Sequence, residues 1–145
     1  MSSSLKKDFI QIRNEVNNTF QSRKGQLIHK RFFEIAKSSP NNVALLEVDD
    51  SSEKVLTYGQ LAEKSLKLAN YLKSVGVKTG DYVSLSLPRG INQIVAIMGI
   101  LSAGATYVPV GIKQPLSRYE KVCSIANIRY LLTDMQNAER YQELK

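Results

Sequence analysis

The chain has 145 residues, of which 43% are hydrophobic and 23% charged, and its formal net charge is +7. This length fits one ordinary domain, and the composition excludes disordered and low-complexity proteins. A single cysteine, Cys123, excludes an internal disulfide framework, and with one histidine, His29, no Cys/His zinc cluster can be assembled. The longest apolar stretch, residues 91–103, is too short to span a bilayer, and no signal-peptide core follows the N-terminus. We therefore expect a soluble cytoplasmic protein.

The positive charge is concentrated in the N-terminal part of the chain. Residues 1–40 hold eight basic and three acidic residues, a balance of +5, whereas the other 105 residues have a balance of +2. A basic leader can bind nucleic acid or an acidic partner. Here the basic residues are scattered, and the nearby phenylalanines are expected to pack rather than to stack on bases. We therefore favour a solvated leader helix over a small basic binding or regulatory module, and expect no nucleic acid partner.

Two helices are predicted before residue 40. Phe9, Ile12, Val16 and Phe20 recur at spacings of three and four, which predicts a helix over about 5–23 that ends near Gly25. A second helix is predicted over 27–37, and residues 38–42 should form a loop. We divide the chain into a basic helical leader or interdomain linker, residues 1–26, and a folded unit, residues 27–145. The side chains expected to point inward from the second helix are Ile28, Phe32, Ile35 and Ala36.

From Val43 onward, predicted strands and helices alternate. Strands are expected at 43–48, 54–56, 82–87, 106–108 and 128–133, the first two as a hairpin and the fourth ended by Pro109. Helices are expected at 58–75, closed by Gly76, at 92–102, apolar nearly all round, and at 116–126. The inward face of the first should hold Tyr58, Leu61, Ala62, Ser65, Leu68, Ala69, Leu72 and Val75, and that of the last Tyr119, Val122, Cys123 and Ala126. The succession predicts an α/β fold with a mostly parallel sheet and right-handed crossovers.

The segment Leu56-Thr57-Tyr58-Gly59-Gln60-Leu61 predicts a helix start. The Thr57 side chain can accept a hydrogen bond from the Gln60 N–H, while the Gln60 side chain reaches back to the Thr57 N–H. Leu56 and Leu61 are placed to form a hydrophobic staple across this capping box. The segment therefore favours a structural role.

Residues 99–106 imitate a phosphate-binding P-loop in which Ala105 replaces the lysine. A P-loop must follow a strand and open a helix, so that its N–H groups face the phosphates. This segment closes a helix and enters a strand, so Gly104 is better explained as a helix stop.

Other candidate residues favour structural roles as well. Asp49, Asp50 and Glu53 could hold a hard cation, but they lack the regular spacing of oxygen ligands and fit a solvated hairpin loop. Cys123 lies on an apolar helix face and is expected to be a core residue rather than a nucleophile. His29 has no indicated triad partner, and Arg118 could bind an anion or brace a loop. The residues alone thus indicate a fold class and no catalytic, cofactor-binding or metal site.

Two segments resemble core motifs of adenylation domains. Residues 56–61, Leu-Thr-Tyr-Gly-Gln-Leu, are similar to the first motif, L-T/S-Y-x-E-L, with Gln60 in place of Glu. Residues 101–110, Leu-Ser-Ala-Gly-Ala-Thr-Tyr-Val-Pro-Val, are similar to the second, L-K-A-G-x-A-Y-V-P-I-D, with Gly111 in place of the final Asp. The similarity runs from about Leu27 to Asp134. The chain thus resembles the opening part of a nonribosomal peptide synthetase adenylation domain, within the acyl-adenylate-forming (AMP-binding) ligase superfamily.

The variant Val108-Pro-Val-Gly-x-x-Gln-Pro115 is similar to adenylation domains of heterocyclising siderophore synthetases, such as the yersiniabactin, pyochelin and anguibactin systems. That resemblance implies an amino acid substrate, with cysteine expected and serine or threonine as alternatives. An opening piece of another acyl- or aryl-acid ligase is the enzymatic alternative.

The resemblance implies that the parent domain uses ATP and Mg²⁺ to activate an amino acid and transfers it to the phosphopantetheine thiol of a carrier domain. In the family this chemistry belongs to a Ser/Thr/Gly-rich phosphate loop, later acidic residues and a C-terminal lysine, none of which occurs in residues 1–145. No catalytic, cofactor or metal residue is therefore assigned. We expect the chain alone to be an inactive scaffold portion that self-associates, with the remainder of the domain and a peptidyl carrier domain as its partners.

Overall fold

The computed structural model describes residues 11–12, 15–16, 25, 27–49 and 52–142. Residues 11, 12, 15 and 16 are helical, and both Ile12 and Val16 are exposed. Phe9 and Phe20, the other apolar positions of the predicted leader helix, lie outside the described residues.

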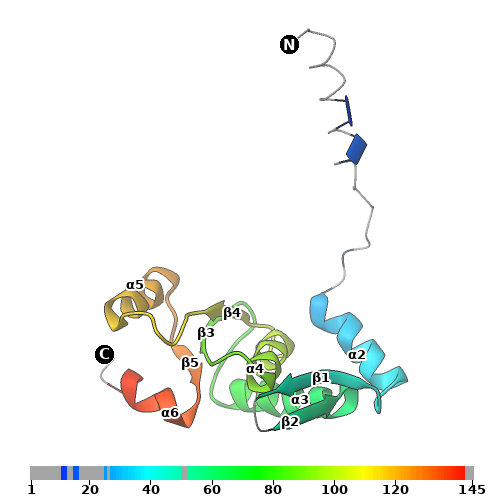
Figure 1. The fold of residues 1–145 in the computed structure, drawn as a ribbon. Coiled ribbons are helices and arrows are strands. Elements are labelled where there is room, and N and C mark those ends of the chain that lie inside the picture. The colour runs from blue at the N-terminus through cyan, green and yellow to red at the C-terminus, as the bar shows by residue number, and fades with distance from the viewer. Residues whose placement is uncertain (1–10, 13–14, 17–24, 26, 50–51, 143–145) are drawn as a thin grey trace.

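Helix α2 (Ile28–Ser38) confirms the second predicted helix, and Ala36 is buried on it. The expectation that Ile28 points inward is wrong, because this side chain is 82% exposed. The first turn of α2 lies at its end farthest from the sheets, so nothing covers Ile28 there (Figure 1). Phe32, near the middle of α2, is half-buried and its ring lies 5.9 Å from that of Tyr58.

Strands β1 (Val43–Val48) and β2 (Glu53–Thr57) form the predicted antiparallel hairpin. Leu46 pairs with Val55 and Val48 with Glu53, with one irregularity of register between Val43 and Leu45. The hairpin is a two-stranded sheet of its own, separate from the parallel sheet.

Helices α3 (Tyr58–Ser74) and α4 (Ile91–Ser102) pack directly on one another. The buried face of α3 holds four of the predicted residues, Leu61, Ser65, Ala69 and Leu72. Val75 follows the end of α3 and is exposed, so its predicted inward position is wrong. Gly99 of α4 allows the close approach, because a Cβ there would lie 2.7 Å from Leu68 Cδ2. No helix in the described part of the chain is long and apolar enough to cross a membrane.

The parallel sheet has the strand order β4-β3-β5, formed by Thr106–Pro109, Tyr82–Ser86 and Tyr130–Thr133. This arrangement confirms the predicted α/β class with parallel pairing. Pro109 lies within β4, opposite Leu85, rather than after the strand. A proline is tolerated there because β4 is an edge strand of this sheet, where one side of the backbone needs no partner.

The two faces of the parallel sheet are covered by different elements. Val83 of β3 and Ile100 of α4 belong to the core between the sheet and the pair α3/α4. The opposite face is covered by α5 (Leu116–Ala126) and by Tyr141 of the 3₁₀ turn η1 (Glu139–Tyr141), which follows the short helix α6 (Met135–Ala138). A smaller core there consists of Val110, Tyr119 and Tyr141. Of the residues predicted to point inward from α5, Tyr119 is buried, while Val122, Cys123 and Ala126 are half-buried.

Candidate functional site

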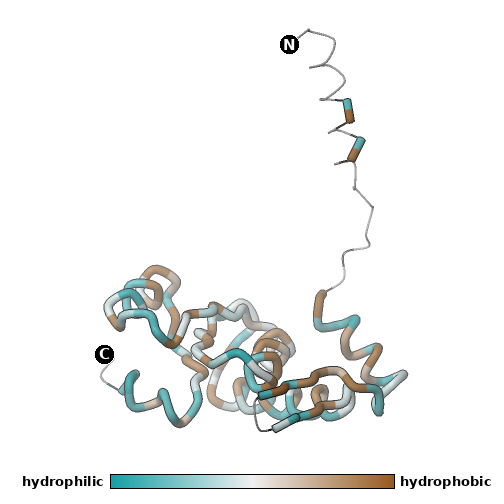
Figure 2. Tube along the Cα trace, in the orientation of Figure 1, coloured by the Kyte–Doolittle hydropathy of each residue, from teal (hydrophilic) through white to brown (hydrophobic). Residues whose placement is uncertain are grey.

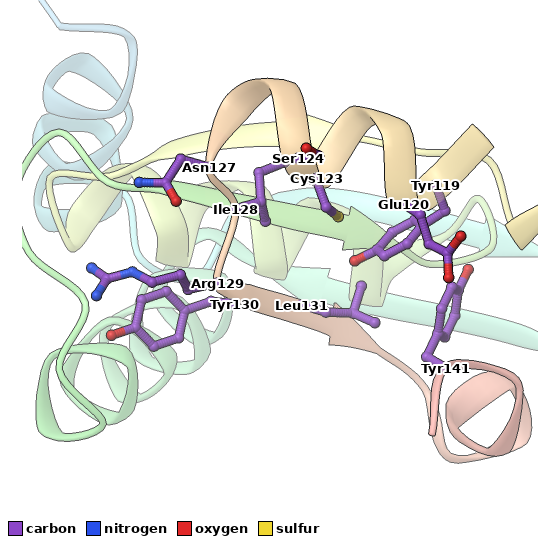
Figure 3. Close-up of a pocket in the computed structure, with 10 residues that line it drawn as sticks. All are labelled: Tyr119, Glu120, Cys123, Ser124, Asn127, Ile128, Arg129, Tyr130, Leu131 and Tyr141. Atoms are coloured by element: carbon purple, nitrogen blue, oxygen red, sulfur yellow. The ribbon is translucent and has the colours of Figure 1, made fainter. Parts of the chain in front are cut away.

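A cavity of about 730 Å³ lies between α5 and the segment that leads into β5 (Figure 3). Tyr119 and Cys123 project into it from α5, Leu131 lines it from β5, and Tyr141 closes it from η1. Arg129 and Tyr130 lie at the other end of the cavity. Its volume is in the range of small-molecule sites, which makes it the natural place to look for chemistry.

Tyrosine and serine hydroxyls meet at one end of this cavity. The rings of Tyr119 and Tyr141 lie with their centroids 5.0 Å apart, and the Tyr141 hydroxyl shares a 2.5 Å hydrogen bond with the buried Ser86 Oγ. Burial raises the pKa of the Tyr119 phenol well above its ordinary value of 10.0, and the nearby Cys123 thiol and Tyr141 phenol raise it further. The Tyr119 phenol is therefore neutral at neutral pH, and its ring packs in the small core with Val110 and Tyr141.

Cys123 is half-buried and lines the cavity, so the expectation of a core position needs correction. It packs against the Tyr119 and Tyr141 core, but α5 stands far enough from the sheet to leave space beside it. His29 lies on α2, which is on the far side of the molecule from α5 in Figure 1. The two residues most suited to nucleophilic catalysis are therefore not brought together.

The acidic loop of the hairpin is a hydrogen-bonded turn. Asp49 accepts hydrogen bonds from the Ser52 N–H (2.7 Å) and from the Ser52 hydroxyl (2.8 Å). Asp50 lies outside the described residues, and Glu53 begins β2. Within the described ranges, no group of three or more His, Cys, Asp or Glu could hold a metal ion.

Arg118 is exposed in the first turn of α5 and takes part in none of the ion pairs of the described residues. The loop between β4 and α5 is instead braced by Arg140, whose guanidinium donates to the carbonyl oxygen of Gln114. A second arginine, Arg129, forms an ion pair at the opposite end of the sheet, where its Nη2 lies 3.8 Å from Asp81 Oδ2. Sequence reasoning missed Arg140, because residues 135–141 lack the periodicity of a longer helix.

Both sequence motifs have structural roles. Thr57 caps α3 by accepting from the Gln60 N–H (3.3 Å), and Gln60 Oε1 accepts from the Thr57 N–H (2.9 Å), which confirms the capping box. Residues 101–110 end α4, turn at Gly104 with φ +84°, and continue as β4. The turn confirms Gly104 as a helix stop, because a positive φ favours glycine.

Glu47 provides a connection that the sequence pattern does not show. Its Oε2 accepts a 2.6 Å hydrogen bond from the Ile91 N–H at the start of α4, and its Oε1 lies 3.5 Å from Lys54 Nζ. A carboxylate at a helix N-terminus binds N–H groups that the helix leaves unpaired. Gly90 leaves room for it, because a Cβ at that position would collide with the Glu47 carboxylate. The only sequence feature that hints at this contact is the position of an acidic residue, Glu47, on the inward side of a strand.

Within the described residues, Cys123 and His29 thus lie apart, and no group of three or more metal-ligating side chains is formed. In parallel α/β sheets, ligands bind beyond the carboxyl ends of the strands, at the point where the strand order reverses. In this sheet that point lies between the ends of β3 and β5, marked by Ser86 and Thr133. The loop after β3 leads there into α4, whose first N–H group is already bound by Glu47.

Comparisons with known proteins identify the family and the relatives of this chain. Residues 32–145 match the family described as AMP-binding enzyme. The chain is 38% identical to the anguibactin system regulator of Vibrio anguillarum over 129 residues, which cover 88% of this chain and 12% of that protein. It is 40% identical to pyochelin synthetase PchE of Pseudomonas aeruginosa over 107 residues, which cover 74% of this chain and 7% of that protein. The solved structure of the nonribosomal peptide synthetase FmoA3 matches with a TM-score of 0.79 and 29% identity, covering 94% of this chain and 14% of FmoA3.

Proposed function

The chain belongs to the AMP-binding enzyme family, and from this premise we propose that it supplies the opening part of an adenylation domain in a siderophore-type nonribosomal peptide synthetase. The observation that carries the proposal is the placement of the two motifs. Residues 56–61 open α3 and residues 101–110 join α4 to β4, within the region that matches the family. The chain spans only 12% and 7% of the length of the two synthetase-system relatives, so the activity of the whole protein is part of the proposal.

In the proposed reaction a carboxylate oxygen of the amino acid attacks the α-phosphorus of ATP, and pyrophosphate leaves. The phosphopantetheine thiol of a carrier domain then attacks the aminoacyl carbonyl, which forms a thioester and releases AMP. We propose cysteine as the amino acid, because Gly111 and the following Gln114-Pro115 give the second motif its siderophore-type form. We propose that Mg²⁺ would accompany the ATP phosphates in the parent domain.

The role of this chain in that reaction is to position elements. The capping box fixes the start of α3, and Glu47 fixes the start of α4 against the hairpin. The Glu47 contact thereby fixes the point at which the chain leaves β3 for α4, near the sheet edge on which the catalytic elements of the parent domain would be built. Alignment of substrates on a rigid scaffold is worth a large part of the barrier in such two-substrate reactions.

The first test is to read the coding sequence beyond the codon for Lys145. We expect the frame to continue into a Ser/Thr/Gly-rich phosphate loop, and the full product to catalyse cysteine-dependent exchange of pyrophosphate with ATP. Exchange that depends on a fatty or aryl acid would favour the acyl-ligase alternative. A stop codon directly after Lys145 would contradict the proposal.

The purified 145-residue chain provides a second test. We expect no amino-acid-dependent exchange from it, because its sequence has no phosphate loop. We also expect it to self-associate through the outer edges of β4 and β5, which have no neighbouring strand in the described sheet. A monomer at all concentrations in analytical ultracentrifugation would contradict that expectation.

A further inference from the structure

The outer face of the hairpin is apolar and uncovered. Leu46, Val48 and Val55 are 59%, 68% and 45% exposed. Leu46 and Val55 are directly paired, and Val48 is two residues along the same strand, so the three side chains lie on one face. Figure 2 shows the apolar character of β1. The opposite face, with Glu47, is turned toward α4. We call the exposed set, Leu46, Val48 and Val55, the outer hairpin face.

The hairpin that carries this face is acidic. Residues 43–57 hold four carboxylates and one lysine. Glu47 and Lys54 are paired with each other, whereas Glu53 lies opposite Val48 on the outer hairpin face and forms no ion pair among the described residues. A segment that covers the face should therefore combine a short apolar stripe with positive charge.

The leader of this chain has both properties. Residues 1–26 hold five basic and two acidic residues. Ile12 and Val16 are helical, four residues apart, and 58% and 70% exposed, so they form an apolar stripe without cover. The eleven residues from 17 to 27 can span up to about 36 Å when extended, about twice the length of roughly 16 Å of the 11-residue helix α2.

We propose that the leader docks on the outer hairpin face of its own chain, with Ile12 and Val16 against Leu46, Val48 and Val55. The net positive charge of residues 1–26 complements the acidic hairpin, which includes Glu53. A second copy fits the face less well. Three side chains offer far less than the roughly 800 Å² per partner of a standard interface, and two acidic hairpins repel one another. The covalent tether also gives the leader an effective concentration in the millimolar range.

Disulfide cross-linking in a Cys123→Ser background tests the contact. We expect Val16→Cys with Val48→Cys to form an intramolecular disulfide under mild oxidation at low micromolar concentration, detected as a monomer of altered mobility on a non-reducing gel. Val16→Cys with Ile125→Cys is the matched control, because Ile125 is an exposed apolar residue (77%) on α5. We expect at least tenfold slower cross-linking in the control. Equal rates for the two pairs would overturn the proposal, and so would a product that is mainly a dimer.

A charge reversal tests the electrostatic part without introduced cysteines. Docking should slow tryptic cleavage after Arg13, and Glu53→Lys should speed that cleavage at least threefold at low salt and less at high salt. Glu120→Lys on α5 makes the same change of charge away from the hairpin and should leave the rate unchanged. Both glutamates are exposed, so folding should survive each substitution. Identical cleavage rates in the wild type and both variants would overturn the proposal.

Discussion

The two faces of the parallel sheet are built in different ways. Toward α3 and α4, the central strand presents Val83 and Leu85, and small residues such as Gly99 let the two helices approach closely. Toward α5, the same strand presents Ser84 and Ser86, and a cavity of about 730 Å³ remains beneath the helix. Every one of these four strand residues is at most 2% exposed. A buried strand therefore does not guarantee a densely packed core, because side chains of the covering helix must also fill the space above it.

The difference in packing between the two faces indicates which face contributes more to the stability of this chain. The fully buried core toward α3 and α4 consists of aliphatic residues between positions 69 and 105, and Tyr107, Tyr130 and Leu132 of the edge strands pack against it. The α5 face depends on tyrosine rings and a hydroxyl pair, which leave space that this chain does not fill. An unfilled face agrees with the proposal that further parts of an adenylation domain pack there.

The largest effect is expected from Ile100→Ala. Ile100 is fully buried between the helix pair and the sheet, so its truncation should lower the free energy of unfolding by about 2–5 kcal/mol. Ile125→Ala, on the exposed side of α5, should change it by less than about 0.5 kcal/mol. Urea unfolding followed by circular dichroism measures both. Equal losses would show that the two faces contribute alike.

Substitution by a larger residue should distinguish the packing of the two faces more clearly. Ala69→Leu inserts volume into the α3/α4 core and should cost about 1–3 kcal/mol of stability. Cys123→Leu extends into the cavity beneath α5 and should cost nothing measurable, or should stabilise the chain. Thermal unfolding of the two variants tests this difference. A comparable loss in Cys123→Leu would show that the cavity is not available to side chains.

Helix caps offer a third comparison. Thr57→Ala removes the cap of the 17-residue helix α3 and should cost about 1 kcal/mol. Asp134 makes a similar cap, accepting from the Asn137 N–H at 2.9 Å, but α6 has only four residues. We expect Asp134→Ala to speed hydrogen exchange in residues 135–141 with little change in global unfolding. Global destabilisation as large as that of Thr57→Ala would contradict local fraying.

The smallest effect concerns alkaline pH. Because the pKa of Tyr119 is raised in the folded state, the unfolded state loses this proton first as the pH rises. The contribution of neutral Tyr119 to the free energy of unfolding is therefore fully present below the unfolded-state pKa of about 10. It decreases as the pH rises above that value. Tyr119→Phe should flatten this alkaline decline, measured as the urea midpoint between pH 9 and 11. An unchanged decline in the variant would assign it to other groups.

Much of the fold could be predicted because its signals are local. The capping residues Thr57 and Gln60 define the start of α3, and Gly104 defines the end of α4. The contact of Glu47 with Ile91 could not be predicted, since the two residues are 44 positions apart and Gly90 offers no side-chain cap. Ser86 and Tyr141 are likewise joined across 55 positions. Cys123 was predicted buried because its helix face is apolar, but burial also depends on what lies opposite, which periodicity does not reveal.

The contact between Glu47 and Ile91 also has a consequence for synthesis on the ribosome. The hairpin emerges from the exit tunnel well before α4, so its carboxylate has no helix N-terminus to bind while residues 58–90 are still being made. During that interval the hairpin is held only by its own pairing and by α3. A two-stranded hairpin is marginal in water without such support. In the ribosome-bound chain, the hairpin should therefore become more resistant to proteases once α4 has cleared the tunnel.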